Sequence, residues 1–269
     1  MKRSIFCGLL AAMLLSTPAQ AAQMEQTERA ERSVVVQVDG HWLESRGVVR
    51  DGVTYVPLGA LLDTLGDWTL TWDAGAAAAV AVSGDRTLIA DPAADTVTLD
   101  GVSHSAVVSV EQGRTMVPLR LVGELLGATV EWDPYLAGAA VTSPDAPYNA
   151  VDYYWLSRII SAESQGEPLE GQIAVGNVVL NRVESDQFPD TIAGVVFDQK
   201  YAVQFEPVEN GTVYSDPYHL SLEAAGRVLN GETTVDGALY FYAPDLSPGT
   251  WINANRTYLT TIGCHRFYL

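Results

Sequence analysis

Residues 158–183 read RIISAESQGEPLEGQIAVGNVVLNRV, and this stretch decides the fold of the C-terminal half of the chain. Apolar residues recur at helical spacing up to it and again within it, which predicts the end of one helix and nearly all of a second. Gly166 and Pro168 separate the helices, since glycine suits a helix C-terminus and proline suits the first turn of the next helix. Glu163 therefore lies at the junction of two packed helices. Partial burial there would raise the pKa of its carboxyl group toward the value that a general acid needs.

The chain after residue 183 predicts shorter elements. Residues 221–229 predict a third helix, and residues 238–242 predict a strand. Residues 204–211 and 243–255 are polar or rich in Pro and Gly, so we expect loops there.

The N-terminal half contains an internal repeat with a spacing of 60 to 61 residues. Residues 51–58 (DGVTYVPL) align with residues 112–119 (QGRTMVPL), and residues 70–73 (LTWD) align with residues 130–133 (VEWD). Each copy predicts short strands, one short helix that opens at a proline and closes at a glycine, and a further strand. The repeat therefore predicts a module built from two copies of one α+β unit.

Each copy also carries one tryptophan, Trp72 or Trp132, at the end of a predicted strand. A large aromatic side chain there can close a small hydrophobic core, and we expect this role for both. The alternative is that one of them stacks on a sugar ring.

A turn-rich segment, residues 144–149, follows the repeat and marks a domain boundary. We therefore expect a first domain at residues 33–143 and a second at residues 150–269. The length of the chain is sufficient for two hydrophobic cores.

Residues 1–21 have the pattern of a signal peptide. Lys2 and Arg3 precede an apolar run at residues 5–15, and small residues lead up to Ala21. We expect cleavage after Ala21 and export of the mature chain. The apolar run is too short to span a bilayer comfortably, so we predict no permanent membrane anchor.

Composition narrows the range of partners. The chain has 33 acidic and 15 basic residues, and its formal net charge is −18. Nucleic acid and anionic membrane surfaces are poor partners for such a chain, whereas a neutral polymer remains open. Its four histidines are scattered without the spacing of a metal site, so we predict no metal or other cofactor. Removal of the leader would leave Cys264 as the single cysteine, and no intramolecular disulfide could form.

The first domain resembles the repeat module named after the N-terminal domain of copper amine oxidases. The pattern V-P-L-x-x-[LV]…LG…W-D carries the resemblance and occurs in both copies. Despite the family name, the resemblance implies no copper here. It suggests contact with the cell wall or with another protein.

The second domain resembles the SleB-type cell wall hydrolases, the family of the spore cortex-lytic enzyme. Six ordered elements carry the resemblance, at residues 162–183, 188–197, 204–211, 238–244, 251 and 262–267. It implies an α+β domain with a lysozyme-like helical core that cleaves the glycan strands of peptidoglycan.

The reaction that this resemblance implies is that of a lytic transglycosylase with Glu163 as its single acid/base. The bond cleaved lies between N-acetylmuramic acid and N-acetylglucosamine. Two alternatives stay open: a muramidase, in which water attacks with help from a second carboxylate, and a wall-binding protein without activity. Glu167, Glu170 and Glu206 are the other acidic candidates. Spore cortex and vegetative wall are both open as targets.

Five further residues are expected to bind substrate, from their positions in the second domain: Gln172, Phe205, Tyr240, Tyr242 and His265. Tyr240 and Tyr242 share one face of a predicted strand, where they either stack on sugars or pack in the core. Gln172 is a candidate to orient Glu163 or a substrate amide. For Phe205 and His265 a structural role is the alternative.

Overall fold

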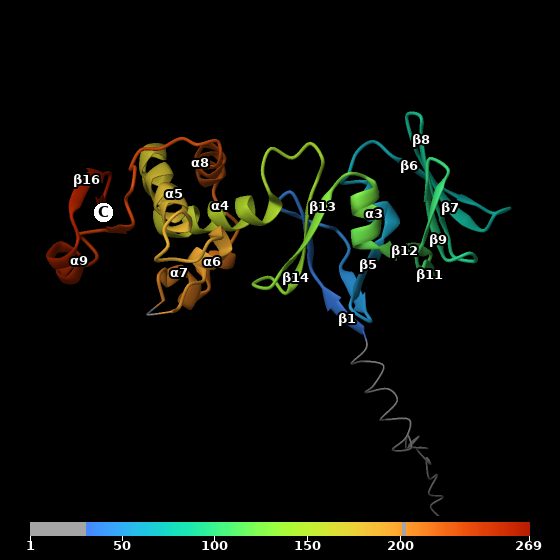
Figure 1. Cartoon of the computed structure of the whole chain (residues 1–269), viewed down its shortest axis with the longest axis horizontal. Helices are drawn as coiled ribbons and strands as arrows, with labels where there is room; N and C mark the ends of the chain where they lie inside the picture. Colours follow the sequence, from blue (N-terminus) through green and yellow to red (C-terminus); the bar gives the residue numbers. More distant parts are fainter. Residues whose placement is uncertain (1–30, 201–202) are drawn as a thin grey trace, which may run out of the picture.

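The computed structural model of the chain describes residues 31–200 and 203–269. The predicted signal peptide, residues 1–21, lies outside the described residues. Figure 1 shows a β-rich N-terminal part at one end and a helical C-terminal part toward the other, with helix α4 (Ala150–Ser164) leading from one into the other. The mixture of helices and strands confirms the predicted α+β class.

The N-terminal part consists of short strands with one short helix in each repeat. Its strands are β1 (Glu31–Val34), β2 (Val36–Val38), β3 (His41–Trp42), β4 (Gly47–Arg50), β5 (Val53–Pro57), β6 (Thr69–Asp73), β7 (Ala78–Ser83), β8 (Arg86–Asp91), β9 (Thr96–Leu99), β10 (Val102–Ser105), β11 (Ser109–Glu111), β12 (Arg114–Pro118), β13 (Thr129–Asp133) and β14 (Gly138–Thr142). Its helices are α2 (Leu58–Leu62) and α3 (Leu119–Leu125). The strands pair in the orders β1-β4-β5-β12-β11, β10-β9-β8-β7-β6 and β13-β14-β2-β3.

The two copies of the repeat meet through equivalent residues. Strands β5 and β12 pair antiparallel, and Val56 stands opposite Val117, its counterpart in the other copy. Such self-pairing is what a local two-fold axis between the copies produces. Val56 and Val117 are fully buried, and helices α2 and α3 contact both strands. The hydrophobic core of this part therefore lies between the copies.

The expected core positions of Trp72 and Trp132 are wrong. Trp72 is 50% exposed and Trp132 is 42% exposed. The physical reason is their place on β6 and β13, which are edge strands of their sheets. The guanidinium of Arg32 lies 5.3 Å from the Trp132 ring centroid and covers part of it.

The C-terminal part packs helices beside a small sheet. Helices α4, α5 (Leu169–Val183) and α8 (His219–Leu229) contact one another. The shorter elements are α6 (Ile192–Val196), α7 (Glu206–Asn210), the 3₁₀ helix η1 (Thr212–Tyr214) and α9 (Thr250–Asn255). The sheet has the order β15-β17-β16, formed by β15 (Tyr240–Tyr242), β17 (His265–Tyr268) and β16 (Tyr258–Ile262).

Local chemistry sets the ends of the two central helices. The Asn149 side chain caps α4 by accepting from the backbone N–H groups of Val151 and Asp152. Pro168 occupies the N-cap of α5, where a missing N–H costs nothing. On α5, a Cβ atom at Gly176 would lie 2.8 Å from the side chain of Ile160 and 2.9 Å from that of Val228. Glycine therefore permits the close approach of α5 to α4 and α8.

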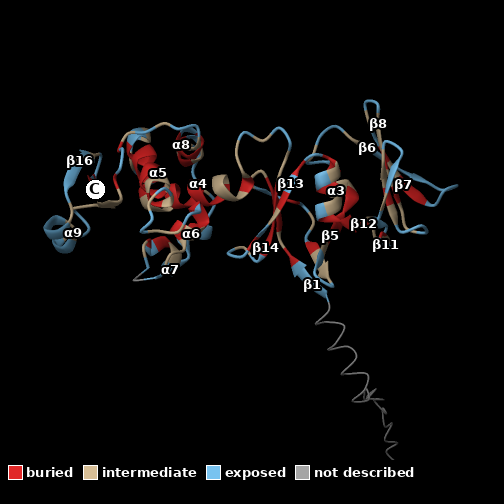
Figure 2. Cartoon of the chain, in the orientation of Figure 1, coloured by how far each residue is buried: buried red, intermediate tan, exposed pale blue. Residues whose placement is uncertain are grey.

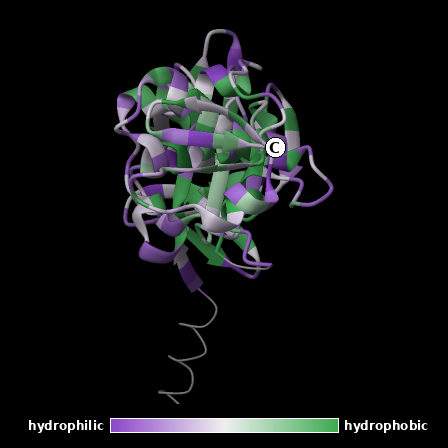
Figure 3. Cartoon of the chain, turned by 90° about the vertical axis from the view of Figure 1, so that its left-hand side faces the viewer, coloured by the Kyte–Doolittle hydropathy of each residue, from purple (hydrophilic) through white to green (hydrophobic). Residues whose placement is uncertain are grey.

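In the described part of the chain, the buried apolar side chains form two clusters, one in each half. Figure 2 shows both as red segments inside exposed loops, and Figure 3 shows hydrophilic loops around a largely hydrophobic interior. The predicted boundary at residues 144–149 stays a prediction, which two separate cores support.

Candidate active site

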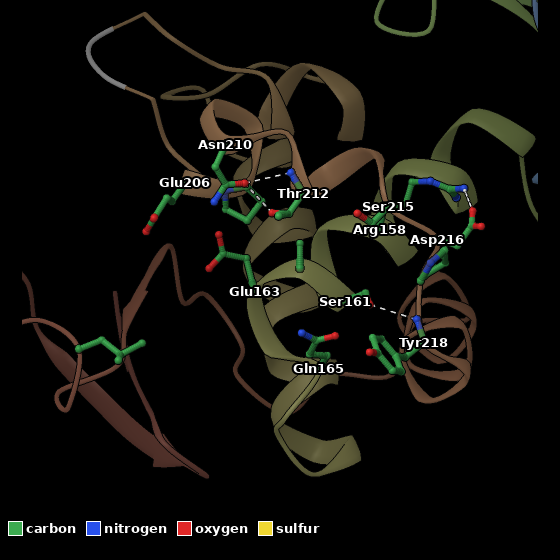
Figure 4. Close-up of a pocket in the computed structure, with 14 residues that line it drawn as sticks. Arg158, Ser161, Glu163, Gln165, Glu206, Asn210, Thr212, Ser215, Asp216 and Tyr218 are labelled. Atoms are coloured by element: carbon green, nitrogen blue, oxygen red, sulfur yellow. Dashed lines mark hydrogen bonds and ion pairs between the residues drawn. The ribbon is translucent and has the colours of Figure 1, made fainter.

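Glu163 lies in the last turn of α4 and opens onto a cavity of about 720 Å³. Besides α4, the walls come from α7, from η1 and from the segment that leads into α8 (Figure 4). The polar side chains that line it with Glu163 are Arg158, Ser161, Gln165, Glu206, Asn210, Thr212, Ser215, Asp216 and Tyr218. The space is large enough for sugar rings and rich in hydrogen-bonding groups.

The surroundings of Glu163 favour the protonated form of its carboxyl group, which is the form that donates a proton. Burial raises its pKa, the negative charge of Glu206 raises it further, and the positive charge of Arg182 opposes them, with a resulting pKa of about 7. At neutral pH a large fraction of the Glu163 side chains therefore carries a proton. An ordinary exposed glutamate, with a pKa of about 4.3, would not.

Glu206 is a second carboxylate beside Glu163 in the lining of the cavity. It lies in the first turn of α7, its side chain is exposed, and it lines the same cavity as Glu163. In Figure 4 both side chains extend toward the same side of the cavity. The third carboxylate in the lining, Asp216, is instead paired with Arg158, with 3.0 Å between Oδ1 and Nη2.

Arg182 supplies the positive charge from beneath the site. It is 4% exposed, and its Nε donates to the carbonyl oxygen of Leu239 at 2.8 Å. Its guanidinium carbon lies 4.9 Å from the ring centroid of Phe188 and 5.1 Å from that of Phe205. Burial lowers its pKa to about 10, so it remains charged at neutral pH.

The residues that line this cavity in the described structure include none of the five predicted substrate contacts. Gln172 is fully buried, donates to the carbonyl oxygen of Glu167 and accepts from the Ser221 hydroxyl. Phe205 is 2% exposed and packs near Arg182. These contacts give Gln172 and Phe205 positions inside the fold.

The other three predicted contacts lie on the small sheet. His265 is 6% exposed, with its ring 5.3 Å from that of Phe241. Tyr240 and Tyr242 are half-buried on β15. The Tyr240 hydroxyl accepts from Arg256 Nη2 at 2.8 Å, and the Tyr242 hydroxyl accepts from Asn253 Nδ2 at 2.9 Å. Of these, the two tyrosines stay candidates for contact with a longer polymer.

Several lining residues were not singled out from the sequence. The side chain of Asn210 accepts from both the backbone N–H and the hydroxyl of Thr212, which fixes the turn between α7 and η1. Ser161 accepts from the backbone N–H of Tyr218 at 3.1 Å and ties α4 to the start of α8. Asn210 stands in one of the six ordered elements, and the Asn-Gly pair there was the available signal.

Glu167, another acidic candidate from the sequence, makes a structural contact and does not line the cavity. Its side chain is 9% exposed, and its Oε2 accepts from the backbone N–H of Cys264 at 2.8 Å. The carboxylate of Glu167 therefore holds the β16–β17 turn against the start of α5. In the described residues, no group of three or more His, Cys, Asp or Glu side chains is arranged to hold a metal ion.

Comparison with known families agrees with this architecture. Residues 166–268 match a family described as Cell Wall Hydrolase, and residues 37–142 match the copper amine oxidase N-terminal domain. Glu163 lies just before the first of these ranges. The C-terminal domain is thus a cell wall hydrolase domain. The chain joins it to a copper amine oxidase N-terminal domain, and both predicted resemblances are confirmed.

Spore cortex-lytic enzymes are similar to the C-terminal half. That of Halalkalibacterium halodurans is 35% identical over 126 residues, which is 47% of this chain and 37% of the relative. That of Bacillus subtilis is 36% identical over 116 residues, or 43% and 37% of the two chains. The chain thus spans less than half the length of these relatives. The solved catalytic domain of the germination-specific lytic transglycosylase SleB from Bacillus anthracis is 35% identical, with a TM-score of 0.42, over 46% of this chain and 98% of that one.

Within residues 31–200 and 203–269, no helix is both long and apolar enough to cross a membrane.

Proposed function

We propose that this protein is an exported enzyme that cleaves peptidoglycan between N-acetylmuramic acid and N-acetylglucosamine, as a lytic transglycosylase with Glu163 as its acid/base. The observation that carries the proposal is a half-buried glutamate, protonated near neutral pH, at the edge of a cavity of about 720 Å³. Similarity to spore cortex-lytic enzymes supports the same substrate class and makes spore cortex the first substrate to test.

The reaction would follow from the two charge states of Glu163. In its protonated form the carboxyl group donates its proton to the glycosidic oxygen, and the bond between that oxygen and C1 of N-acetylmuramic acid breaks. Positive charge develops at C1. The C6 hydroxyl of the same sugar then attacks C1 and gives its proton to the Glu163 carboxylate. The product is a 1,6-anhydro ring, water is not consumed, and Glu163 is again protonated.

Glu206 supports a second candidate, a hydrolase that uses water. Glycosidases that use water place two carboxyl groups on either side of the scissile bond. Glu206 lines the cavity with Glu163 and is exposed enough to bind a water molecule. In this reaction Glu206 would remove a proton from the water that attacks C1, and the product would have a reducing end.

Export and wall contact complete the proposal. The signal peptide pattern at residues 1–21 would carry the chain to the compartment that holds its substrate. The repeat module would keep the hydrolase domain near the wall or near a partner protein.

Mass spectrometry of the fragments released from purified peptidoglycan tests the proposal. Wild type, Glu163→Gln and Glu206→Gln are incubated with cortex and with vegetative peptidoglycan. The proposal predicts anhydromuramyl ends from wild type and none from Glu163→Gln. Reducing ends that disappear in Glu206→Gln would establish the hydrolase instead. No fragments from wild type on either substrate would leave only the wall-binding alternative.

A further inference from the structure

We infer that the first repeat contributes a sugar-binding subsite to the catalytic cleft, centred on Trp42, and that it holds the glycan strand beyond the sugars at Glu163. The inference rests on the proposed function, because the glycan strand is its ligand. It assigns to the repeat module a direct contact with the substrate of the neighbouring domain.

A second cavity, of about 310 Å³, lies where the first repeat meets α4. One wall is the β2–β3 hairpin, with Gly40, His41 and Trp42. The opposite wall is the N-terminal half of α4, with Tyr153 and Tyr154. Residues from both halves of the chain are therefore required to form it.

This cavity continues the one at Glu163. Arg158, Asp216 and Pro217 line both cavities. Arg158 is 4% exposed, whereas the Asp216 side chain with which it pairs is 90% exposed. The boundary between the cavities is thus a fixed arginine and a carboxylate that remains free to accept hydrogen bonds from sugar hydroxyls. A polymer leaving Glu163 along this side passes Asp216 and reaches Trp42.

Trp42 has the form of a sugar-stacking residue. Its side chain is 47% exposed, yet it contacts the buried Tyr154 ring, with the two centroids 5.6 Å apart at an angle of 70°. The Arg158 guanidinium carbon lies 3.6 Å from the centroid of the same tyrosine ring. Trp42 is therefore an exposed aromatic surface on a rigid support, which suits the apolar face of a pyranose ring.

The hairpin that presents Trp42 is fastened to α4. Gln37 is fully buried; its Nε2 donates to the carbonyl oxygen of Ala150 at 3.2 Å, and its Oε1 accepts from the backbone N–H of Gly40 at 2.7 Å. Gly40 has a φ of +85°, and a Cβ atom there would lie 3.5 Å from the Tyr153 ring. The turn is thus packed directly on the helix, and the subsite is preorganised relative to Glu163.

The test compares two substrates of different length. Uncross-linked glycan strands reach both cavities, whereas a tetrasaccharide of alternating N-acetylglucosamine and N-acetylmuramic acid is centred at Glu163. We expect Trp42→Ala to raise the KM for strands about tenfold relative to the KM for the tetrasaccharide, the effect of one aromatic contact. Trp42→Tyr should recover most of the loss. Val102→Ala, which removes an exposed apolar side chain from edge strand β10 of the same module, should match wild type on both substrates.

Calorimetry measures the binding of strands to Glu163→Gln protein, with and without Trp42→Ala. Together with activity, it distinguishes failure of the subsite from failure of the proposed enzymatic function. Active wild type with a KM and an affinity that do not depend on Trp42 would refute the subsite alone. Inactive wild type with Trp42-dependent strand binding would refute the enzymatic function and retain the subsite. Equal losses from Trp42→Ala and Val102→Ala would also overturn the inference, because the effect would then not be local to the cleft.

Discussion

Trp155 donates a hydrogen bond of 2.7 Å from its indole Nε1 to Oδ2 of Asp133, and both residues are buried. Asp133 is the last residue of β13 in the second repeat, and Trp155 belongs to the helix that carries Glu163. The other carboxylate oxygen of Asp133 accepts from the backbone N–H groups of Tyr135 and Leu136. Asp73, the counterpart in the first repeat, makes the same turn contacts with Gly75 and Ala76 but lies exposed. One copy of the motif has therefore become part of a contact between the two halves.

Asp133→Ala is expected to destabilise the protein by about 3 kcal/mol, because it leaves a buried indole N–H and two turn amides without their acceptor. Asp73→Ala, in which only exposed turn amides lose a partner, should cost about 0.5–1 kcal/mol. Urea unfolding followed by tryptophan fluorescence measures both. Equal losses in the two variants would show that the Trp155 contact contributes nothing.

Glu163 should make stability depend on pH. A glutamate in the unfolded chain has a pKa of about 4.3, whereas burial raises the pKa of Glu163 in the fold to about 7. Between these values the folded protein holds a proton that the unfolded chain has released, so the free energy of unfolding falls as pH rises through this window. The stabilisation from the Glu163 proton is fully present below the pKa of glutamate in the unfolded chain and is lost above the pKa of Glu163 in the folded protein.

Glu163→Gln removes this titration. The variant should exceed wild type in stability at pH 8 by about 2 kcal/mol, with a smaller difference at pH 4. Thermal unfolding at a series of pH values, with wild type beside the variant, is the measurement. A constant difference between the two curves from pH 4 to pH 8 would contradict a raised pKa at Glu163.

Glu206→Gln should move the pH dependence of cleavage. The negative charge of Glu206 is the second cause of the raised pKa of Glu163, after burial. Its removal lowers the pKa of Glu163, so the protonated acid is lost at a lower pH. We expect the alkaline limb of kcat/KM to shift to lower pH, while the rate at pH 5 stays within about threefold of wild type. A loss of more than about a hundredfold at every pH would instead assign Glu206 a part in the chemistry.

Gly263→Ala should loosen the C-terminal hairpin. Gly263 has a φ of +57°, and a Cβ atom there would lie 1.7 Å from Oε2 of Glu167, which holds the hairpin through Cys264. Gly231, with a φ of +87° and no atom within 4 Å of its Cβ position, is the matched control.

Gly231→Ala is expected to cost about 1 kcal/mol from backbone strain alone, and Gly263→Ala at least 2 kcal/mol more from the collision with Glu167. Urea unfolding ranks the two variants. If Glu167→Ala restored nothing to Gly263→Ala in a double-mutant cycle, the collision would not be the cause.

Local sequence rules predict much of the fold. Helix α5 begins one residue after Pro168 and ends at Val183, as proline chemistry and apolar spacing predict. Repeat alignment likewise placed Val56 and Val117 in equivalent strands, although their direct pairing follows only from the three-dimensional arrangement. Residues 206–210 and 250–255, expected as loops, are short helices. Pro207 in the first turn of α7 and Gly211 after it were the signals for one of them.

The position of Glu163 at a helix end was predictable from the sequence, whereas the walls of the cavity beside it were not. Glu163 could be placed because a helix end and a turn fix its position along the chain. The cavity walls come from residues more than forty positions away, such as Asn210 and Asp216, and depend on how α7 and η1 fold back on α4. Trp42 is farther still, and only the packing of a hairpin on Tyr154 brings it to the cleft.

The direct connection between the two halves would limit how far the hydrolase domain could move from a wall-bound repeat module. The side-chain oxygen of Asn149 caps α4, and its Nδ2 donates to Glu131 of the second repeat at 2.6 Å. The residue that precedes the helix is therefore held by both halves and is not part of a free linker. A tether of many flexible residues would let an enzyme sweep a wide area around its anchor. Here the repeat module and the helix that carries Glu163 are instead joined by direct hydrogen bonds, from Asn149 to Glu131 and from Trp155 to Asp133. A repeat module bound at one point of the wall would therefore confine cleavage to a single neighbourhood, and degradation would advance by release and rebinding of the whole molecule.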